Sequence, residues 1–444
     1  MPNRYYKSTA TTWNSINSWS ATSPTASDNA GIPTIADDVI FTNQSSLTCN
    51  IPSATTVTNR QILNITTTGY TGTITLDADL FIYGNHTIGA TTFNGAGWYT
   101  VANSATTRTI SAASATFLNF ALGVSGNGTA TTFTISTTLN VTNIRHAACA
   151  GFTTNSSQVN ISGSMTMDNA AIRWSGTTQY FLNGSGNGTF GSSFNNGTFG
   201  VDITINKTGG TITFLPFVRL YNIATTPTFT YLAGTVVTTG STFYVDRNYT
   251  LSTTNGINTL SFNNVIFGFG VLTTLTLNSK IKILGNLTLG VQATVINGSD
   301  IEIEGNVLYN GGGNAGISYN KGTATIKFIG GTNTVIQGIN NASTNALLIG
   351  MNLNINKSGS GKVTLVPTTT NSKIYFAPGG APTGQLPMTI TVTSGSLDAQ
   401  AGSTVVVGSS AITYTTLLTL NTGSNTVTFP NLNVEFAGNQ LNIT

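Results

Sequence analysis

Two ten-residue segments that follow the same pattern lie only twenty residues apart in this chain. The first, "IKILGNLTLG", begins at Ile281, and the second, "IEIEGNVLYN", begins at Ile301. Related segments are "LFIYGNHTIG" from Leu80 and "VNISGSMTMD" from Val159. The shared form is apolar-x-apolar-x-Gly-Asn/Ser-apolar-x-apolar, from which His86 and Leu308 depart, and this alternation is the two-residue period of a β-strand. The pattern predicts a strand, a corner and a second strand.

The corner of each segment is a Gly-Asn or Gly-Ser step. Such steps favour turns, because glycine adopts a positive φ at little cost. We therefore expect a turn or a bulge at the four corner glycines, which are Gly84, Gly163, Gly285 and Gly305.

A repeat of about twenty residues is too short to hold a helix or a domain between its copies. It matches one lap of a β-solenoid, in which each coil pairs with the coils above and below and buries its apolar face only by stacking. We predict an all-β fold, a right-handed parallel β-helix (β-solenoid) with an N-terminal cap. Laps of roughly 20 to 25 residues would give about 18 coils. A chain of β-sandwiches is the competing fold, since sandwiches also alternate in short strands.

A longer internal repeat is superimposed on the short one. "ITINKTGGTITFLP" from Ile203 matches "LNINKSGSGKVTLVP" from Leu353, and two further pairs of segments follow in the same order. Asn, Ser and Thr stacked in register are expected to form side-chain ladders between coils. We divide the chain into a capping module (1–60), a first solenoid part (61–200), a second part (201–350), and a partial repeat with the C-terminal end (351–444).

The composition excludes several classes of protein. Hydrophobic residues make up 39% of the 444 residues but charged residues only 7%, against roughly 25% in average globular proteins. A net charge of +3 without a Lys/Arg run is too small for nucleic-acid binding. No stretch approaches about 18 consecutive apolar residues, and the first residues lack a secretory signal. We therefore expect no nucleic acid, no membrane insertion and synthesis in the cytoplasm.

The acidic residues permit catalysis but do not favour it. Asp77 with Asp79, and Asp300 with Glu302 and Glu304, have the spacing that places carboxylates on one face of a strand. Such a face could hold a catalytic pair or an ion, but a solvated outer face explains it as well. We predict a protein that is not an enzyme, with no catalytic residue, no cofactor and no metal site.

The histidine and cysteine residues also point away from a metal site. His146 and Cys149 form the one His/Cys cluster, whereas zinc needs about four ligands. We expect a buried thiol and a surface imidazole there, and free thiols at Cys49 and Cys149.

Aromatic side chains could form platforms on which sugar rings stack, although large aromatics in a solenoid often pack in the core. The aromatic residues considered for this role are Tyr5, Tyr6, Trp98, Tyr99, Trp174, Tyr180 and Tyr221.

The N-terminal segment from Thr11 to Phe41 reads "TTWNSINSWSATSPTASDNAGIPTIADDVIF". It resembles the opening module of many bacterial and phage repeat proteins, in which two tryptophans precede a Val-Pro-Thr-x-Ala-Asp-Asp-Val-x-Phe segment. The second tryptophan usually follows Asn, and Ser18 stands there in this chain. The matching residues are Trp13, Trp19, Ile32, Pro33, Thr34, Ala36, Asp37, Asp38, Val39 and Phe41. The resemblance implies a cap, formed above all by Trp13, Trp19, Pro33, Asp37 and Asp38, at the start of a solenoid.

The same resemblance implies a function. We expect a structural protein in the virion of a tailed phage, such as a fibre, a spike or a capsid decoration that attaches to a host surface or glycan. Proteins of this kind commonly form trimers, so a homotrimer in contact with other virion proteins is expected. The alternatives are a bacterial cell-surface adhesin or secreted matrix protein, and a polysaccharide depolymerase.

Overall fold

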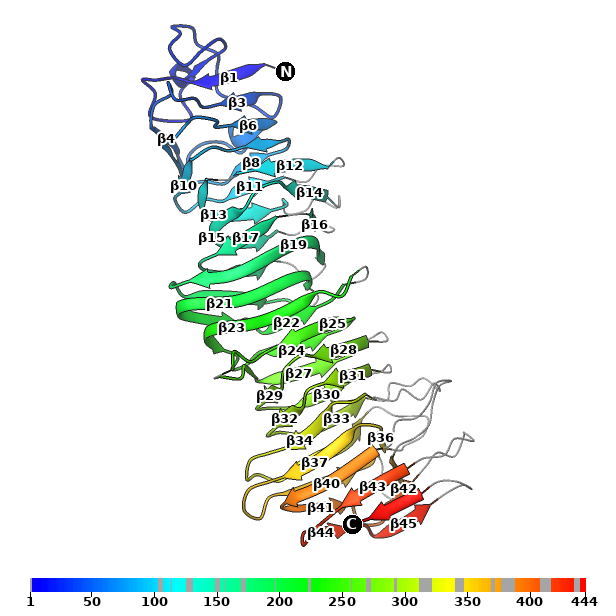
Figure 1. Cartoon of the computed structure of the whole chain (residues 1–444). Helices are drawn as coiled ribbons and strands as arrows, with labels where there is room; N and C mark the ends of the chain where they lie inside the picture. The colour runs from blue at the N-terminus through cyan, green and yellow to red at the C-terminus, as the bar shows by residue number, and fades with distance from the viewer. Residues whose placement is uncertain are drawn as a thin grey trace. The chain divides into compact units, whose positions relative to one another are not determined.

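The chain folds as an all-β protein in which parallel coils stack into a β-solenoid of about 13 turns (Figure 1). In this computed structural model, 57% of the chain is strand and 2% is helix. The chain divides into two compact units, Met1–Val218 with Leu232–Val237 and Arg219–Tyr231 with Thr238–Thr444. The boundaries predicted from sequence at residues 60, 200 and 350 stay predictions. The structure describes residues 2–444 except 103–106, 113, 125–130, 148–151, 156, 169–172, 196, 223–224, 257, 269–272, 291–293, 311–321, 340–346, 369–371, 377–387, 408–416 and 435–439.

The ten-residue segments form strand, corner and strand, as predicted. The strand pairs are β8 (Leu80–Ile82) and β9 (His86–Thr87), β17 (Gln158–Ile161) and β18 (Met165–Met167), β29 (Ile281–Ile283) and β30 (Leu287–Leu289), and β32 (Ile301–Ile303) and β33 (Val307–Asn310).

The two segments twenty residues apart stack directly on one another. Ile281 pairs in parallel with Ile301, and Leu287 with Val307. All four side chains are fully buried, so each segment completes the core that its neighbour leaves open. The solenoid prediction is confirmed.

The reason for the corner glycines differs from the prediction. None of the four has a positive φ, so backbone conformation does not require glycine there. Crowding requires it instead. A Cβ on Gly305 would lie 2.0 Å from the carbonyl oxygen of Gly285, and a Cβ on Gly285 would lie 2.5 Å from Oδ1 of Asn264. The coil below therefore leaves no room for a side chain.

Asparagine side chains link the coils at the same corner. The backbone N–H of Asn286 donates to Oδ1 of Asn264 at 2.9 Å, and that of Asn306 donates to Oδ1 of Asn286 at 3.1 Å. Val335 N–H continues the ladder onto Oδ1 of Asn306 at 2.9 Å. In unit 1 the N–H of Asn85 donates to Oδ1 of Asn64 at 2.6 Å. These ladders are the ones expected from the Asn-rich sequence.

The number of coils is smaller than about 18, because laps are longer than expected in the later part of the chain. The ladder bond between Asn306 and Asn286 spans 20 residues, whereas the bond between Val335 and Asn306 spans 29. The bond from Thr389 N–H to Oδ1 of Asn352 spans 37 residues. Added loop residues lengthen a lap without changing how its strands stack.

The longer repeat is explained by a buried lysine. Lys207, in β21 (Thr198–Phe214), donates through Nζ to the carbonyl oxygens of Ser162 at 2.6 Å and Asn183 at 2.9 Å. Lys357 occupies the matching position in the second copy and donates to the carbonyl oxygen of Ile329 at 2.7 Å.

A glycine covers each of these lysines. A Cβ on Gly234 would lie 2.5 Å from Cβ of Lys207, and a Cβ on Gly395 would lie 2.9 Å from Cβ of Lys357. The side chains of both lysines are almost fully buried, at 2% and 0% exposure. The repeat thus preserves a pair of residues, a lysine and the glycine stacked against it.

The N-terminal module closes the first coil. Strand β1 (Asn3–Tyr6) pairs in parallel with β3 (Asp38–Ile40) and antiparallel with β2 (Trp19–Ser20). Trp13 and Trp19 are fully buried, with ring centroids 4.8 Å apart, and their indole N–H groups donate to the carbonyl oxygens of Asn59 and Trp13. The mixed pairing and the two indoles cover strand edges that would otherwise be open.

The acidic residues of the module make turn and inter-coil hydrogen bonds. Asp37 follows the buried Pro33 by four residues and accepts bonds from the N–H and the hydroxyl of Thr34, at 2.8 and 2.9 Å. Asp38 accepts a bond of 2.7 Å from Nδ2 of Asn64 on the next coil.

Candidate functional site

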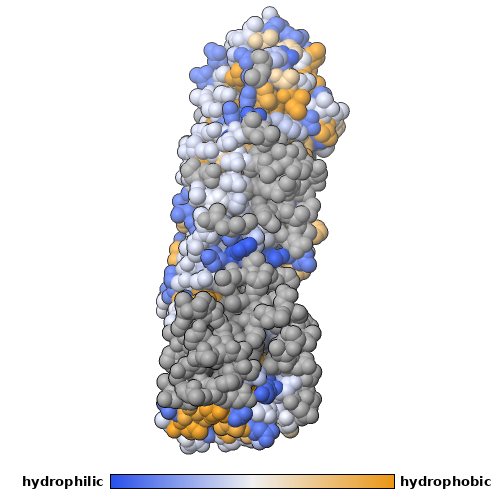
Figure 2. Space-filling model, turned by 90° about the vertical axis from the view of Figure 1, so that its right-hand side faces the viewer, coloured by the Kyte–Doolittle hydropathy of each residue, from blue (hydrophilic) through white to orange (hydrophobic). Residues whose placement is uncertain are grey.

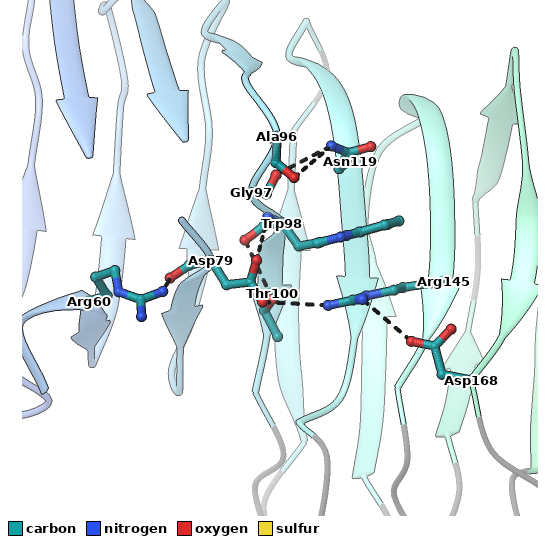
Figure 3. Close-up of polar contacts among 9 residues, drawn as sticks. All are labelled: Arg60, Asp79, Ala96, Gly97, Trp98, Thr100, Asn119, Arg145 and Asp168. Carbon is teal, nitrogen blue, oxygen red and sulfur yellow. Dashed lines mark hydrogen bonds and ion pairs between the residues drawn. The ribbon is translucent and has the colours of Figure 1, made fainter. Parts of the chain in front are cut away.

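One outer face of unit 1 carries a cluster of charged and aromatic side chains (Figure 3). It lies on β8, β11 (Tyr99–Val101), β13 (Thr116–Leu122), β15 (Leu139–His146) and β18, which stack in that order. Four side chains form it, and we call them the Arg145 cluster. Its members are Asp79, Trp98, Arg145 and Asp168.

The stacking order brings these residues together from distant parts of the sequence. Leu80 pairs with Tyr99, so the preceding residues Asp79 and Trp98 are neighbours at one corner. Arg145 lies further along the stack, on β15, and is separated from Asp79 by 66 residues in sequence. Its side chain reaches across the intervening coils to that corner.

Arg145 is held between two carboxylates. Its Nη2 lies 3.5 Å from Oδ2 of Asp79, and its Nη1 lies 3.5 Å from Oδ2 of Asp168. The guanidinium carbon lies 4.1 Å from the centroid of the Trp98 ring, within the range of a cation–π contact. Figure 3 shows the two groups one over the other, between the carboxylates. Desolvation raises the pKa of Asp168, and the charge of Arg145 opposes that rise.

Small residues lie beneath the Arg145 side chain. Thr100 and Ala121 pair with one another, Ala121 pairs with Arg145, and all three point outward from the sheet. Thr100 is nevertheless only 2% exposed and Ala121 is 0% exposed. Larger side chains therefore cover these two small residues on the outer face.

Backbone hydrogen bonds fix the flanks of the cluster. Asp79 accepts a 2.9 Å bond from Trp98 N–H on Oδ1, and its carbonyl oxygen accepts a 2.8 Å bond from Nη1 of Arg60. On the other flank, Nδ2 of Asn119 donates to the carbonyl oxygen of Gly95 at 3.1 Å.

Most of the predicted acidic residues lie in ion pairs with basic side chains. Asp77 is exposed, while Asp79 belongs to the Arg145 cluster. In unit 2, Glu302 lies within 3.6 Å of Lys327 and 3.4 Å of Lys280. Glu304 forms a 2.9 Å pair with Lys282. These pairs between successive coils support the interpretation of a solvated outer face.

Both histidines are buried and neutral. Desolvation lowers the pKa of His86 to about 3, and the charge of Arg108 adds to this effect. His86 Nδ1 lies 2.8 Å from the hydroxyl of Tyr99. Burial also lowers the pKa of His146 to about 3, and its Nδ1 lies 2.9 Å from the carbonyl oxygen of Ala147.

The expectation of a surface imidazole at His146 is therefore wrong. The alternation of the strand predicts burial, because His146 stands two residues after the buried Ile144 and its side chain lies on the same face. Cys49 is a free, buried thiol whose pKa is raised by burial to about 12. Cys149 lies outside the described residues. Among the residues that the structure describes, no three His, Cys, Asp or Glu side chains are grouped so as to hold a metal ion.

Most of the aromatic residues considered as sugar platforms belong to the core. Tyr6, Tyr99, Trp174 and Tyr180 are fully buried. The partly exposed ones are Tyr5, Trp98 and Tyr221. Of these, Trp98 lies in the Arg145 cluster, whereas the ring of Tyr221 lies 5.4 Å from the guanidinium of Arg247 in unit 2.

Sequence reasoning considered Trp98 and Asp79 but missed Arg145 and Asp168 as their partners. A signal for Asp168 existed, since it directly follows the strand of the segment that begins at Val159. No comparable signal marks Arg145, because the register between its coil and that of Asp79 depends on loops of unequal length.

Hydrophobic side chains reach the surface in the N-terminal module, as Figure 2 shows for one face. The large ones exposed in this module are Ile16, Ile35, Leu47 and Val57. In the described part of the chain, no helix is long and apolar enough to cross a membrane.

Comparison of the chain with protein-family models, with curated proteins and with solved structures found no match. The β-solenoid fold therefore stands on the structure itself, and the resemblance of the N-terminal module to phage and bacterial repeat proteins stays a prediction.

Proposed function

We propose that this chain is a non-enzymatic structural protein of a tailed-phage virion, a fibre, a spike or a capsid decoration that attaches to a host surface. The observation that carries the proposal is the continuous stacking of parallel coils within each unit, reinforced by side-chain ladders. Such a stack satisfies its backbone hydrogen bonds between coils and buries one continuous core. A rigid scaffold with few reactive groups suits a particle exposed to the environment.

The arrangement of the carboxylates supports a role without catalysis. Hydrolysis of a glycosidic bond needs two carboxyl groups that flank the bond, with room for the sugar between them. In the Arg145 cluster a guanidinium fills the space between Asp79 and Asp168. In unit 2, lysines pair with Glu302 and Glu304.

The proposal includes a homotrimer and contacts with other virion proteins. Exposed apolar side chains in the N-terminal module, such as Leu47 at 61% and Ile16 at 56%, support a protein contact there. Light scattering of the purified chain should give three times the mass of 46.1 kDa.

The decisive experiment is immunogold labelling of purified phage particles with an antibody against the chain, with mass spectrometry of the same particles. We expect label at a defined position on the virion. Label on the host cell and none on particles would refute the proposal and favour an adhesin. Incubation with capsular polysaccharide should release no new reducing or unsaturated ends, and their appearance would favour a depolymerase.

A further inference from the structure

We propose that the Arg145 cluster binds a neutral sugar ring of a surface glycan. In this site the indole of Trp98 stacks on the ring, and Asp168 and Asp79 accept hydrogen bonds from its hydroxyl groups. The inference rests on the proposed attachment function and assigns a location and a ligand class to it.

Trp98 differs from the other tryptophans of the chain. Of the four, Trp13, Trp19 and Trp174 are 0% exposed, and only Trp98 keeps a partly exposed side chain. Tryptophan combines a large apolar face with low conformational freedom, and a ring held at the surface is suited to stack on the C–H face of a pyranose.

The cluster is already ordered without a ligand. The backbone of Trp98 is fixed on both sides, since its N–H donates to Asp79 and its carbonyl oxygen accepts a 2.9 Å bond from Leu80 N–H. The guanidinium of Arg145 is held by carboxylates at both ends. Binding a rigid sugar therefore costs little further side-chain entropy.

The carboxylates can still accept hydrogen bonds from hydroxyl groups. Asp168 contacts Arg145 through Oδ2, and its side chain is 40% exposed. A carboxylate oxygen offers two lone-pair sites, so Asp79 can also accept a further bond beside those from Trp98 and Arg145. Arg145 covers one face of the indole and both carboxylates lie on that side, so a ring stacked on the opposite face would reach these acceptors past the edge of the indole.

The pairing of charges in the cluster favours a neutral ligand. The carboxylates of Asp79 and Asp168 are balanced by the guanidinium groups of Arg60 and Arg145. Arg145 already has both of its carboxylate partners, so it offers no unpaired charge to an anionic sugar. The pairs themselves are partly exposed and contribute little to stability.

The test uses the full chain and a panel of neutral oligosaccharides that contain glucose, galactose or N-acetylglucosamine, with uronic-acid and sialylated counterparts. Because the other three tryptophans are buried, Trp98 should dominate any change of intrinsic fluorescence on binding. We expect saturable binding of at least one neutral oligosaccharide at millimolar concentration or below, and none of similar strength for its acidic counterpart.

Calorimetry on variants completes the test. Trp98→Ala should weaken binding at least tenfold, and Asp168→Asn, a substitution at an exposed carboxylate, about threefold or more. Tyr221→Ala is the matched control, since it removes another partly exposed ring beside an arginine and should leave binding unchanged. Circular dichroism and the melting temperature establish that each variant is folded, and Asp168→Asn remains informative if Trp98→Ala does not fold.

The site proposal is overturned if no neutral oligosaccharide binds, if acidic ones bind more tightly, or if both Trp98→Ala and Asp168→Asn bind like the wild type. This outcome is separable from failure of the proposed function. Glycan binding without label on particles would leave the site in a cell-surface protein, whereas label on particles without glycan binding would leave a virion protein with another receptor contact.

Discussion

Replacement of Gly305 by alanine tests the crowding that defines the corners of the solenoid. The new Cβ would lie 2.0 Å from the carbonyl oxygen of Gly285 and 2.5 Å from its carbonyl carbon. These atoms are backbone, and neighbouring bonds hold them, such as the 2.7 Å bond from Gly285 N–H to the carbonyl oxygen of Asn263. The coil below cannot move away without breaking its own hydrogen bonds.

The expected loss combines two effects. Overpacking in a well-packed region costs about 1 to 3 kcal/mol. Separation of the coils would also weaken the bond from Asn306 N–H to Asn286, worth about 1 kcal/mol. We therefore expect Gly305→Ala to lower the free energy of unfolding by about 3 kcal/mol, measured by urea denaturation with circular dichroism.

A matched control separates crowding from backbone strain. Gly240 lies in the same unit, has a φ of +77°, and would have no atom within 4 Å of a new Cβ. Gly240→Ala should cost about 1 to 2 kcal/mol from its left-handed conformation alone. If Gly305→Ala costs no more than Gly240→Ala, the explanation of the corner glycines by close approach is wrong.

Three further predictions concern polar groups in the stack. Asn286→Ala should cost about 1 to 2 kcal/mol in urea unfolding, because Asn306 N–H loses its acceptor, whereas Asn286→Asp keeps an acceptor and should cost less; equal losses would contradict the ladder. The pKa of His86 is about 3 in the folded chain against 6.5 ordinarily, so the unfolded chain takes up the proton first as pH falls. His86→Leu should therefore lose about 3 kcal/mol less stability than the wild type between pH 7 and pH 4, and parallel pH profiles would refute burial of a neutral ring. Burial lowers the pKa of Lys207, so the unfolded chain binds its proton more readily and this residue should make the fold more stable as pH rises toward about 10. Between pH 8 and pH 10 the melting temperature of Lys207→Met should therefore rise less, or fall more, than that of the wild type. The same change of melting temperature in both proteins would contradict burial of the Lys207 amine.

Local features of the fold were predictable, because they depend on neighbours in sequence. The segments at Leu80, Val159, Ile281 and Ile301 form strands on both sides of their glycine, as alternation alone predicts. Contacts between coils were harder to predict, because each depends on the length of the intervening lap.

The corner glycines and the Arg145 cluster show where the prediction reached its limit. The backbone that crowds Gly305 belongs to the coil below. A rule about the conformation of single residues therefore marked these glycines as important but assigned them a positive φ that they do not have. The cluster needs Asp79 and Arg145 in contact although 66 residues separate them. Only the summed lengths of the coils between them fix that alignment, and these lengths vary.

The corner asparagines have a consequence for how such a chain can evolve. The N–H of Asn286 donates a hydrogen bond to the asparagine of the preceding coil, and its Oδ1 accepts one from the following coil. Each corner of this kind therefore presents the next coil with the same acceptor that it uses itself. After duplication or deletion of one complete lap, the backbone N–H at the new junction would still face an asparagine Oδ1. Gene rearrangements in whole-lap steps can thus change the number of coils while the hydrogen bonds between neighbouring coils stay the same.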